Sequence, residues 1–195
     1  MSVQEHILVL PANVVEKLFN SPVHGLNWIR LINDESKYLW MRRERVEEDS
    51  NYRQIIPYAV VEKDGKILVY RRYKDGAEKR LVSKYSFGFG GHIHKSDKNW
   101  IEGFRRELVE EIELKPEQYV FAVKGIICSN STFVDSVHLG IIIQVNIIDP
   151  EFEPLPNLSE VSELIWSSYS GMQSITNVEW ESWSKLLLEN DYWRL

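Results

Sequence analysis

Residues 86–114 read SFGFGGHIHKSDKNWIEGFRRELVEEIEL, which predicts a short strand, a glycine-rich loop and an acidic helix in succession. We expect the helix to run from about Asn99 to Ile112. Asn99 can accept hydrogen bonds from the free N–H groups of the first turn, and Glu102 follows at capping-box spacing. Apolar residues recur at helical spacing along one face and form a stripe to be buried: Ile101, Phe104, Leu108 and Ile112.

Three carboxylates lie on the adjacent face of this helix, at Glu107, Glu110 and Glu111. Residues at this spacing have Cβ atoms about 5–6 Å apart, so the three charges repel one another. A hard cation such as Mg²⁺ or Mn²⁺ relieves the repulsion, because it prefers oxygen ligands and completes its coordination with water and phosphate. Arg106 precedes Glu110 by four residues and can orient that carboxylate.

Each feature has an ordinary alternative when it is taken alone. Charge runs are usually solvated helix faces, and closely spaced glycines usually mark a turn. Together, a strand, a glycine-rich loop and an acidic helix indicate a site for metal and phosphate, because glycine lets a ligand approach the main chain closely.

The flanking sequence predicts a mixed sheet. The stretches Gln54–Val61 and Lys66–Arg71 are separated by a turn containing Asp64-Gly65, a strong hairpin signature. Further strands are expected at Ser86–Phe89, Gln118–Cys128, Val137–Ile147 and Glu163–Ser167, and a last helix at Asn177–Glu189. The order predicts an α/β fold of the α+β type, with the sheet sandwiched between helices.

We interpret residues 1–50 as an N-terminal extension that packs on a core domain of residues 51–195. The extension contains an apolar run at His6–Leu10, a helical pattern at Ala12–Phe19 and a strand-like run at Tyr38–Met41. Completion of the pocket and a homodimer interface both remain open as its role.

Composition excludes several classes of protein. The net charge of −6 provides no basic field to attract DNA or RNA. The single cysteine, Cys128, excludes an intramolecular disulfide, and its apolar surroundings favour a buried, inert thiol. The N-terminus lacks the pattern of a signal peptide, and no apolar stretch reaches the length of a membrane span, so a cytoplasmic protein without membrane contact is expected.

The stretch from Gly91 to Leu114 resembles the box of the Nudix superfamily. That box is Gly, five residues, Glu, seven residues, Arg-Glu, an aliphatic residue, any residue, Glu-Glu, any residue, Gly and an aliphatic residue. Gly91, Arg106-Glu107-Leu108, Glu110-Glu111 and Leu114 match it. Asp97 stands in place of the first Glu with one extra residue before Arg106, and Glu113 replaces the last Gly. That Gly position favours a left-handed backbone that is costly for Glu.

The resemblance implies a Nudix-like fold and hydrolysis of a pyrophosphate bond in a small, nucleotide-derived diphosphate, with Mg²⁺ or Mn²⁺ as cofactor. It makes Glu107 and Glu111 the first metal ligands, Glu110 a ligand or the general base, and the carbonyl of Gly91 a further ligand. Arg106 takes a structural and electrostatic role. Because some relatives recruit a base from outside the box, Glu179 and Glu181 are alternatives to Glu110.

Four residues are candidates for substrate contact: Arg72, Arg80, His92 and Asp97. Solvated surface charge is the alternative for the two arginines. His138 is expected to be a satisfied core or edge histidine.

Two other functions compete with the hydrolase. A non-catalytic module of the same fold would sense a nucleotide or sugar phosphate, and the displaced Asp97 keeps that reading open. Isopentenyl-diphosphate isomerases share the Nudix fold but carry a reactive cysteine just before the box, where this chain has none.

Overall fold

The computed structural model describes residues 5–19, 27–72, 84–156, 161–175 and 178–190. Its described strands form one nine-stranded sheet. They are β1 (His6–Pro11), β2 (Leu39–Arg42), β3 (Tyr52–Lys63), β4 (Lys66–Arg72), β5 (Tyr85–Ser86), β6 (Gly88–Phe89), β7 (Tyr119–Ile127), β8 (His138–Ile147) and β9 (Val161–Ser167). The helices are α1 (Ala12–Phe19), α2 (Asn27–Asn33), α3 (Arg43–Val46), α4 (Trp100–Ile112), α5 (Phe133–Ser136), α6 (Tyr169–Ser174) and α7 (Ser182–Glu189), with single 3₁₀ turns at Glu35–Lys37 and Pro116–Gln118.

The long strand β3 organises the sheet. It pairs antiparallel with β1, β4 and β6, and parallel with β8 in a register from Gln54↔His138 to Glu62↔Asn146. Strand β7 pairs antiparallel with β8, and β9 with β4. The sheet is therefore mixed, as the sequence predicts.

The predicted hairpin joins β3 to β4. Asp64 and Gly65 both have positive φ, at 52° and 72°. Two successive left-handed residues form a type I′ turn, whose twist matches that of the strands it connects.

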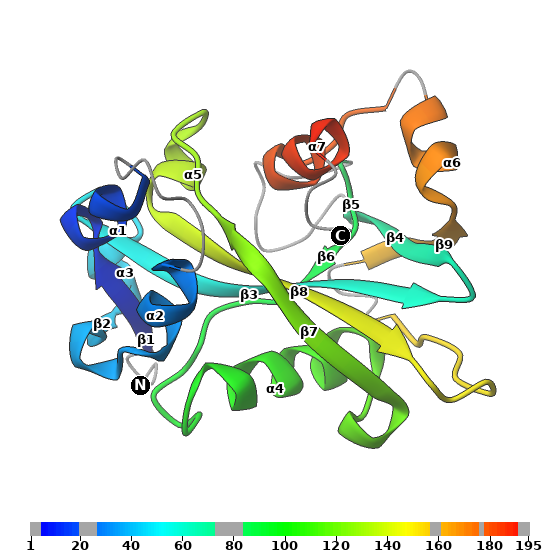
Figure 1. Ribbon diagram of the computed structural model, residues 1–195, viewed down its shortest axis with the longest axis horizontal. Coiled ribbons are helices and arrows are strands. Elements are labelled where there is room, and N and C mark those ends of the chain that lie inside the picture. The colour runs from blue at the N-terminus through cyan, green and yellow to red at the C-terminus, as the bar shows by residue number, and fades with distance from the viewer. Residues whose placement is uncertain (1–4, 20–26, 73–83, 157–160, 176–177, 191–195) are drawn as a thin grey trace.

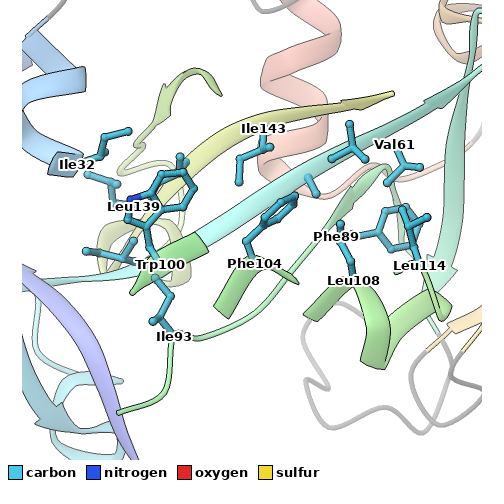
Figure 2. Close-up of a cluster of buried hydrophobic side chains, with 14 of the residues drawn as sticks. Ile32, Val61, Phe89, Ile93, Trp100, Phe104, Leu108, Leu114, Leu139 and Ile143 are labelled. Carbon is cyan, nitrogen blue, oxygen red and sulfur yellow. The ribbon is translucent and has the colours of Figure 1, made fainter. Parts of the chain in front are cut away.

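Helices α4 and α7 lie on opposite sides of the sheet (Figure 1). The alternation of side chains along β3 sends Ala59 and Val61 into the same buried cluster as α4, and Tyr58 and Val60 into the cluster that includes α7. Figure 2 shows Trp100, Phe104 and Leu108 of α4 directed toward Val61, Leu139 and Ile143 of the sheet. The predicted apolar stripe of α4 is thereby confirmed, with Phe104, Leu108 and Ile112 fully buried and Ile101 partly so.

The first described residues extend the same sheet. Strand β1 lies between β2 and β3, pairing antiparallel with each, and α1 follows it at the predicted residues. Backbone hydrogen bonds join β1 to β3, so these residues belong to the same sheet as the core. The division of the chain at residue 50 stays a prediction.

Two predicted elements differ in the structure. The strand expected at Ser86–Phe89 is split into β5 and β6 on either side of Phe87. The last helix begins at Ser182 rather than Asn177; position 177 itself lies outside the described residues. Residues just before Ser182 run beside β5, where Tyr85 donates to the Glu179 carbonyl and accepts from the Glu181 N–H.

Helices α2 and α6 are short elements that the sequence patterns did not predict. Within the described residues, no helix is long and apolar enough to cross a membrane.

Candidate active site

A cavity of about 400 Å³ lies where the glycine-rich loop, α4, α5 and α7 meet β3 and β8. Its lining residues come from both ends of the chain and from the predicted box: Glu5, Arg43, Ile56, Tyr58, Gly88, Gly90, Gly91, His92, His94, Arg106, Glu107, Glu110, Glu111, Val134, Asp135, His138, Glu181, Ser182 and Trp183. A cavity of this size accommodates a small organic ligand.

The glycine-rich loop is shaped by contacts that exclude side chains. Gly90 has φ of 144°, and a Cβ there would collide with the Pro57 carbonyl of β3. At Gly91 a Cβ would lie 2.6 Å from Oε2 of Glu107, so the missing side chain leaves room for that carboxylate against the main chain. The loop can therefore hold two box carboxylates beside its backbone.

Helix α4 supplies these carboxylates. It begins after Asn99, whose side chain accepts from the Glu102 N–H at 3.0 Å, as predicted, while the Glu102 carboxylate accepts from Arg105. Oε2 of Glu111 accepts from the Gly90 N–H at 2.8 Å. This bond ties the helix to the loop at the floor of the cavity.

Arg106 connects several acidic groups. Its Nη1 donates to Glu107 at 2.7 Å and to Glu110 at 2.9 Å. Its Nε and Nη2 donate to both oxygens of Asp97, at 3.1 and 3.0 Å, and Nη2 also donates to the His92 carbonyl at 2.8 Å. The predicted pair with Glu110 is present, and Arg106 also fixes the loop relative to the helix.

Asp97 occupies a position behind Arg106. It is absent from the cavity lining, and its Oδ2 accepts from the His94 N–H at 2.8 Å. Its hydrogen bonds from Arg106 and His94 hold its pKa below the ordinary value, against the effect of burial. The displaced acid of the box thus orients Arg106. Because Asp97 lies outside the cavity lining, its position does not support the predicted contact with substrate.

The cavity is strongly acidic. Six carboxylates and two guanidinium groups line it. Burial raises the pKa of Glu107, and the neighbouring Glu110 and Asp97 act in the same direction against Arg106. An anionic ligand would be repelled unless cations accompany it.

The donor set fits a hard divalent cation. It consists of three carboxylates, with the Gly91 backbone against Glu107. As the side chains stand, no group of three or more His, Cys, Asp or Glu in the described part of the chain is in metal-binding position, because Glu107 and Glu110 are bound to Arg106. A cation at this site would be held by Glu107, Glu111 and Glu110, with Glu107 and Glu110 turning from Arg106 to the metal.

Two half-buried histidines, His92 and His138, form another part of the lining, with ring centroids 5.7 Å apart. Burial is the main cause that lowers the pKa of both His92 and His138, and Arg43 adds to it. Nε2 of His92 lies 2.7 Å from Oε1 of Gln54, whose amide nitrogen donates to the Val46 carbonyl, so His92 is the donor in this pair. His138 is half-buried, its Nδ1 lies 2.7 Å from the Val134 carbonyl, and it also lines the cavity.

The remaining side of the cavity is built by α5 and the start of α7. Asp135 is buried, accepts from Ser182 Oγ at 2.6 Å and caps α5 by accepting from the Thr132 N–H at 3.1 Å. Arg53 anchors α5 by donating to the Asp135 and Ser136 carbonyls and to Asn130. Trp183 packs edge-on against Tyr58, with centroids 5.5 Å apart.

The structure separates the three candidate general bases. Glu110 and Glu181 line the cavity, and Glu181 is buried. Glu179 is absent from that lining, is 72% exposed and pairs with Lys84 at 2.8 Å. Glu110 and Glu181 therefore stay candidates, and the position of Glu179 does not support that role.

The side chains of the two arginines predicted to contact substrate lie outside what the structure describes. Arg80 lies outside the described residues, and Arg72 is described only as the last backbone position of β4. Instead, Arg43 lines the cavity and pairs with Glu47 at 2.8 Å and with Glu5 at 3.2 Å. Sequence patterns did not single out Arg43, because the pairing of β1 with β2 joins residues that are far apart along the chain.

Cys128 is half-buried, donates to the His138 carbonyl at 3.8 Å and is not part of the cavity lining. Burial raises the pKa of its thiol, which leaves it a poor nucleophile. This matches the expected inert thiol and removes support for isomerase chemistry.

No protein-family model matches the chain. Protein YmaB of Bacillus subtilis (strain 168) is 36% identical over 120 residues, which are 55% of this chain and 56% of that protein. The similarity thus spans little more than half the length of that relative.

Solved structures match the fold over more of the chain. Tm1382, a proposed Nudix hydrolase, superposes with a TM-score of 0.76 at 24% identity, covering 98% of this chain and 100% of that one. The Nudix domain of Shewanella oneidensis NrtR, in complex with ADP ribose, has a TM-score of 0.52 at 16% identity, over 73% of this chain and 88% of that one.

Proposed function

This chain has the fold of the Nudix hydrolases, and from that premise we propose that it is a divalent-metal-dependent hydrolase of pyrophosphate bonds. The observation that carries the proposal is the convergence of Glu107, Glu110 and Glu111 with the Gly90–Gly91 backbone on one acidic cavity. The cavity has an excess of carboxylates and would repel an anionic substrate. Cations bound between the carboxylates and the substrate would remove this repulsion.

The proposed cofactor is Mg²⁺ or Mn²⁺, held by Glu107, Glu111 and Glu110 with help from the Gly91 carbonyl. When bound, such a cation neutralises the diphosphate and lowers the pKa of a coordinated water. The substrate is proposed to be a nucleoside diphosphate linked to a further group, in line with the nucleotide-derived ligand in the NrtR complex.

The chain's own residues are proposed to position the substrate and to deprotonate the attacking water. Arg106 is anchored by Asp97, so its charge stays beside Glu107 and Glu110 and would face the phosphoryl groups of a bound diphosphate. Glu110 is the first candidate to accept the proton from the attacking water, and buried Glu181 is the second. A pH–rate profile of Glu181→Gln separates the two, since loss of the true base removes the acidic limb.

Glu107→Gln and Glu111→Gln test the proposal. Each keeps the size of the side chain but weakens a metal ligand. Mutation of a residue that only hydrogen-bonds to a metal ligand already lowers metal affinity or activity by about 10–100-fold. We expect each variant to lose more than about 100-fold in metal-dependent phosphate release, with an unchanged circular dichroism spectrum.

The matched control is Glu102→Gln, on the exposed face of the same helix, which should keep wild-type turnover. The measurement is phosphate release from a panel of diphosphates titrated with Mg²⁺ and Mn²⁺. Wild-type turnover in both Glu107 and Glu111 variants would contradict the site, and binding without turnover by the wild type would favour a nucleotide-sensing module.

A further inference from the structure

Gln54 is a polar side chain that is fully buried in the sheet, next to the cavity. It is 0% exposed, and its backbone is fixed in β3 by pairing with Val9 of β1 and with His138 of β8. Alternation along β3 places Gln54 on the same face as Ile56 and Tyr58, which line the cavity. A buried amide is costly unless its polar atoms are hydrogen-bonded, so its partners are the reason that this position can be polar.

The two side-chain hydrogen bonds of Gln54 fix the direction of its amide. Nε2 donates at 3.2 Å to the carbonyl of Val46, the last residue of α3, and a carbonyl can only accept. The amide oxygen therefore faces Nε2 of His92, 2.7 Å away, and that ring nitrogen carries the hydrogen. Because the sheet fixes the base of the Gln54 side chain and α3 fixes its tip, the amide holds the His92 ring in one position.

His92 lies among the contacts that join the glycine-rich loop to α4. Its own carbonyl accepts from Nη2 of Arg106 at 2.8 Å. The Gly91 carbonyl, a proposed metal ligand, belongs to the peptide group directly before it. Gly90, one residue earlier, donates its N–H to Glu111 at 2.8 Å. Because consecutive residues make these contacts, a shift of His92 would displace the Gly91 carbonyl and loosen the hold on Glu111.

The part of the loop that follows His92 is held by the backbone of β1. The Leu8 N–H donates to the Ile93 carbonyl at 3.0 Å, and the Lys95 N–H donates to the His6 carbonyl at 3.0 Å. These bonds involve no side chain, so they remain when the nearby amide is replaced. Loss of the bond between amide and imidazole should therefore shift the loop at the metal site without releasing it from the sheet.

We propose that Gln54 is a positioning residue for the metal site: through His92 it fixes the glycine-rich loop so that the Gly91 carbonyl and Glu111 converge on one cation. The proposal rests on the proposed function, because this loop and the α4 carboxylates are the metal site of that function. The contacts from α3 and β1 also give the first 50 residues a role as supports of the loop.

The test measures Mn²⁺ binding to the full chain without substrate, by electron paramagnetic resonance and by calorimetry. Gln54→Leu removes both side-chain hydrogen bonds and approximately keeps the volume of the side chain. We expect its dissociation constant for Mn²⁺ to rise by about tenfold or more, because residues that orient metal ligands typically change metal affinity by about 10–100-fold. The matched control is Gln144→Leu in β8, which removes a hydrogen bond to Glu62 of the same sheet, outside the cavity lining, and should leave Mn²⁺ binding unchanged.

Substitutions of His92 test whether Gln54 acts through this ring. His92→Gln keeps a side-chain N–H donor and should restore most of the Mn²⁺ affinity, whereas His92→Leu removes the donor and should lose as much as Gln54→Leu. Because both leucine variants break the same hydrogen bond, the double variant should bind Mn²⁺ no more weakly than either single variant. A role of Gln54 in stability alone would produce neither the rescue by glutamine nor this coupling.

The outcomes separate the positioning role from the hydrolase assignment. Unchanged Mn²⁺ affinity in a folded Gln54→Leu protein overturns the positioning role, and so do equal affinities of His92→Gln and His92→Leu. If circular dichroism shows that Gln54→Leu does not fold, the two His92 variants decide the question, since that position is only half-buried. A wild type that binds Mn²⁺ but hydrolyses no diphosphate contradicts the proposed function alone, because the affinities of the variants still decide the positioning role. A wild type that binds no Mn²⁺ overturns both.

Discussion

Arg106 is the residue on which the candidate site depends most. One guanidinium donates to three carboxylates and a carbonyl, which places it in a bidentate pair with Asp97 and in contact with two box glutamates. Spacing along a helix predicts the pair with Glu110, because that contact is local. It does not predict Asp97, because the intervening loop path decides whether an acid nine residues earlier reaches Arg106.

Glu113 illustrates a sequence departure with a direct structural counterpart. It caps the end of α4 with φ of 57° and ψ of 25°, the left-handed conformation that the missing box glycine would favour. A non-glycine residue pays about 1–2 kcal/mol in this conformation. Its side chain is exposed, so little packing compensates.

We therefore expect Glu113→Gly to raise the free energy of unfolding by about 1 kcal/mol, measured by chemical denaturation, with turnover unchanged. Lys115→Gly is the control, because Lys115 is exposed and has φ of −91°, where glycine only adds freedom to the unfolded chain. A destabilised Glu113→Gly protein would show that the Glu113 side chain stabilises the fold in addition to the backbone cap.

The glycine-rich loop and α4 act as one element. Their strand–loop–helix order, the Asn99 start and the buried stripe follow from local patterns, and the structure confirms all three. The predicted start of α7 at Asn177 was wrong for a non-local reason. Glu179 and Glu181 form backbone hydrogen bonds with Tyr85, which belongs to a strand far away in the sequence. The spacing of apolar residues along a helix contains no information about such pairing with a distant strand.

Gly91→Ala tests the fit between this loop and the helix. The backbone at Gly91 tolerates a side chain, but the new methyl group would press on the Glu107 carboxylate, 2.6 Å from its Cβ position. We expect the fold to be kept and turnover to fall by about tenfold or more, because small displacements of a catalytic group are costly.

Gly125→Ala is the matched control in strand β7, where the nearest atom to a new Cβ is 4.0 Å away. Thermal unfolding and kcat are measured for both variants. Full activity in Gly91→Ala would mean that the position of Glu107 against the loop is not needed.

At the scale of the whole molecule, the cavity gathers residues that no single motif contains. Glu5, Arg43, Asp135 and Trp183 come from four separate segments. The sequence predicts the mixed sheet and the acidic helix, since both rest on local periodicity. It does not predict the other walls, because these depend on which segments the sheet order brings together.

Stability should depend on pH through His92 and His138, the two half-buried histidines of the cavity. Burial lowers the pKa of His92 and His138 in the folded protein, while an unfolded chain takes up protons near pH 6.5. Below that pH the unfolded state binds more protons, so the free energy of unfolding falls as pH falls. The slope is at most about 1.4 kcal/mol per pH unit for each ring.

Chemical denaturation between pH 7.5 and 5.5 measures this slope, above the range in which carboxylates with ordinary pKa values titrate. His138→Gln, which can still donate to the Val134 carbonyl, should flatten it in part. A stability that stays constant or rises as pH falls would contradict neutral, half-buried rings.

The parallel pairing of β3 with β8 has a consequence for how the site comes into being. Its first register pair, Gln54↔His138, closes a long chain loop that contains β4 to β7, the glycine-rich loop and α4. Such non-local closure is entropically expensive and slow. Ile56 and Tyr58 on one strand and His138 on the other line the same cavity, so no partly folded form without this pairing can contain it. The capacity to bind substrate therefore depends on a contact between distant parts of the chain and cannot precede it.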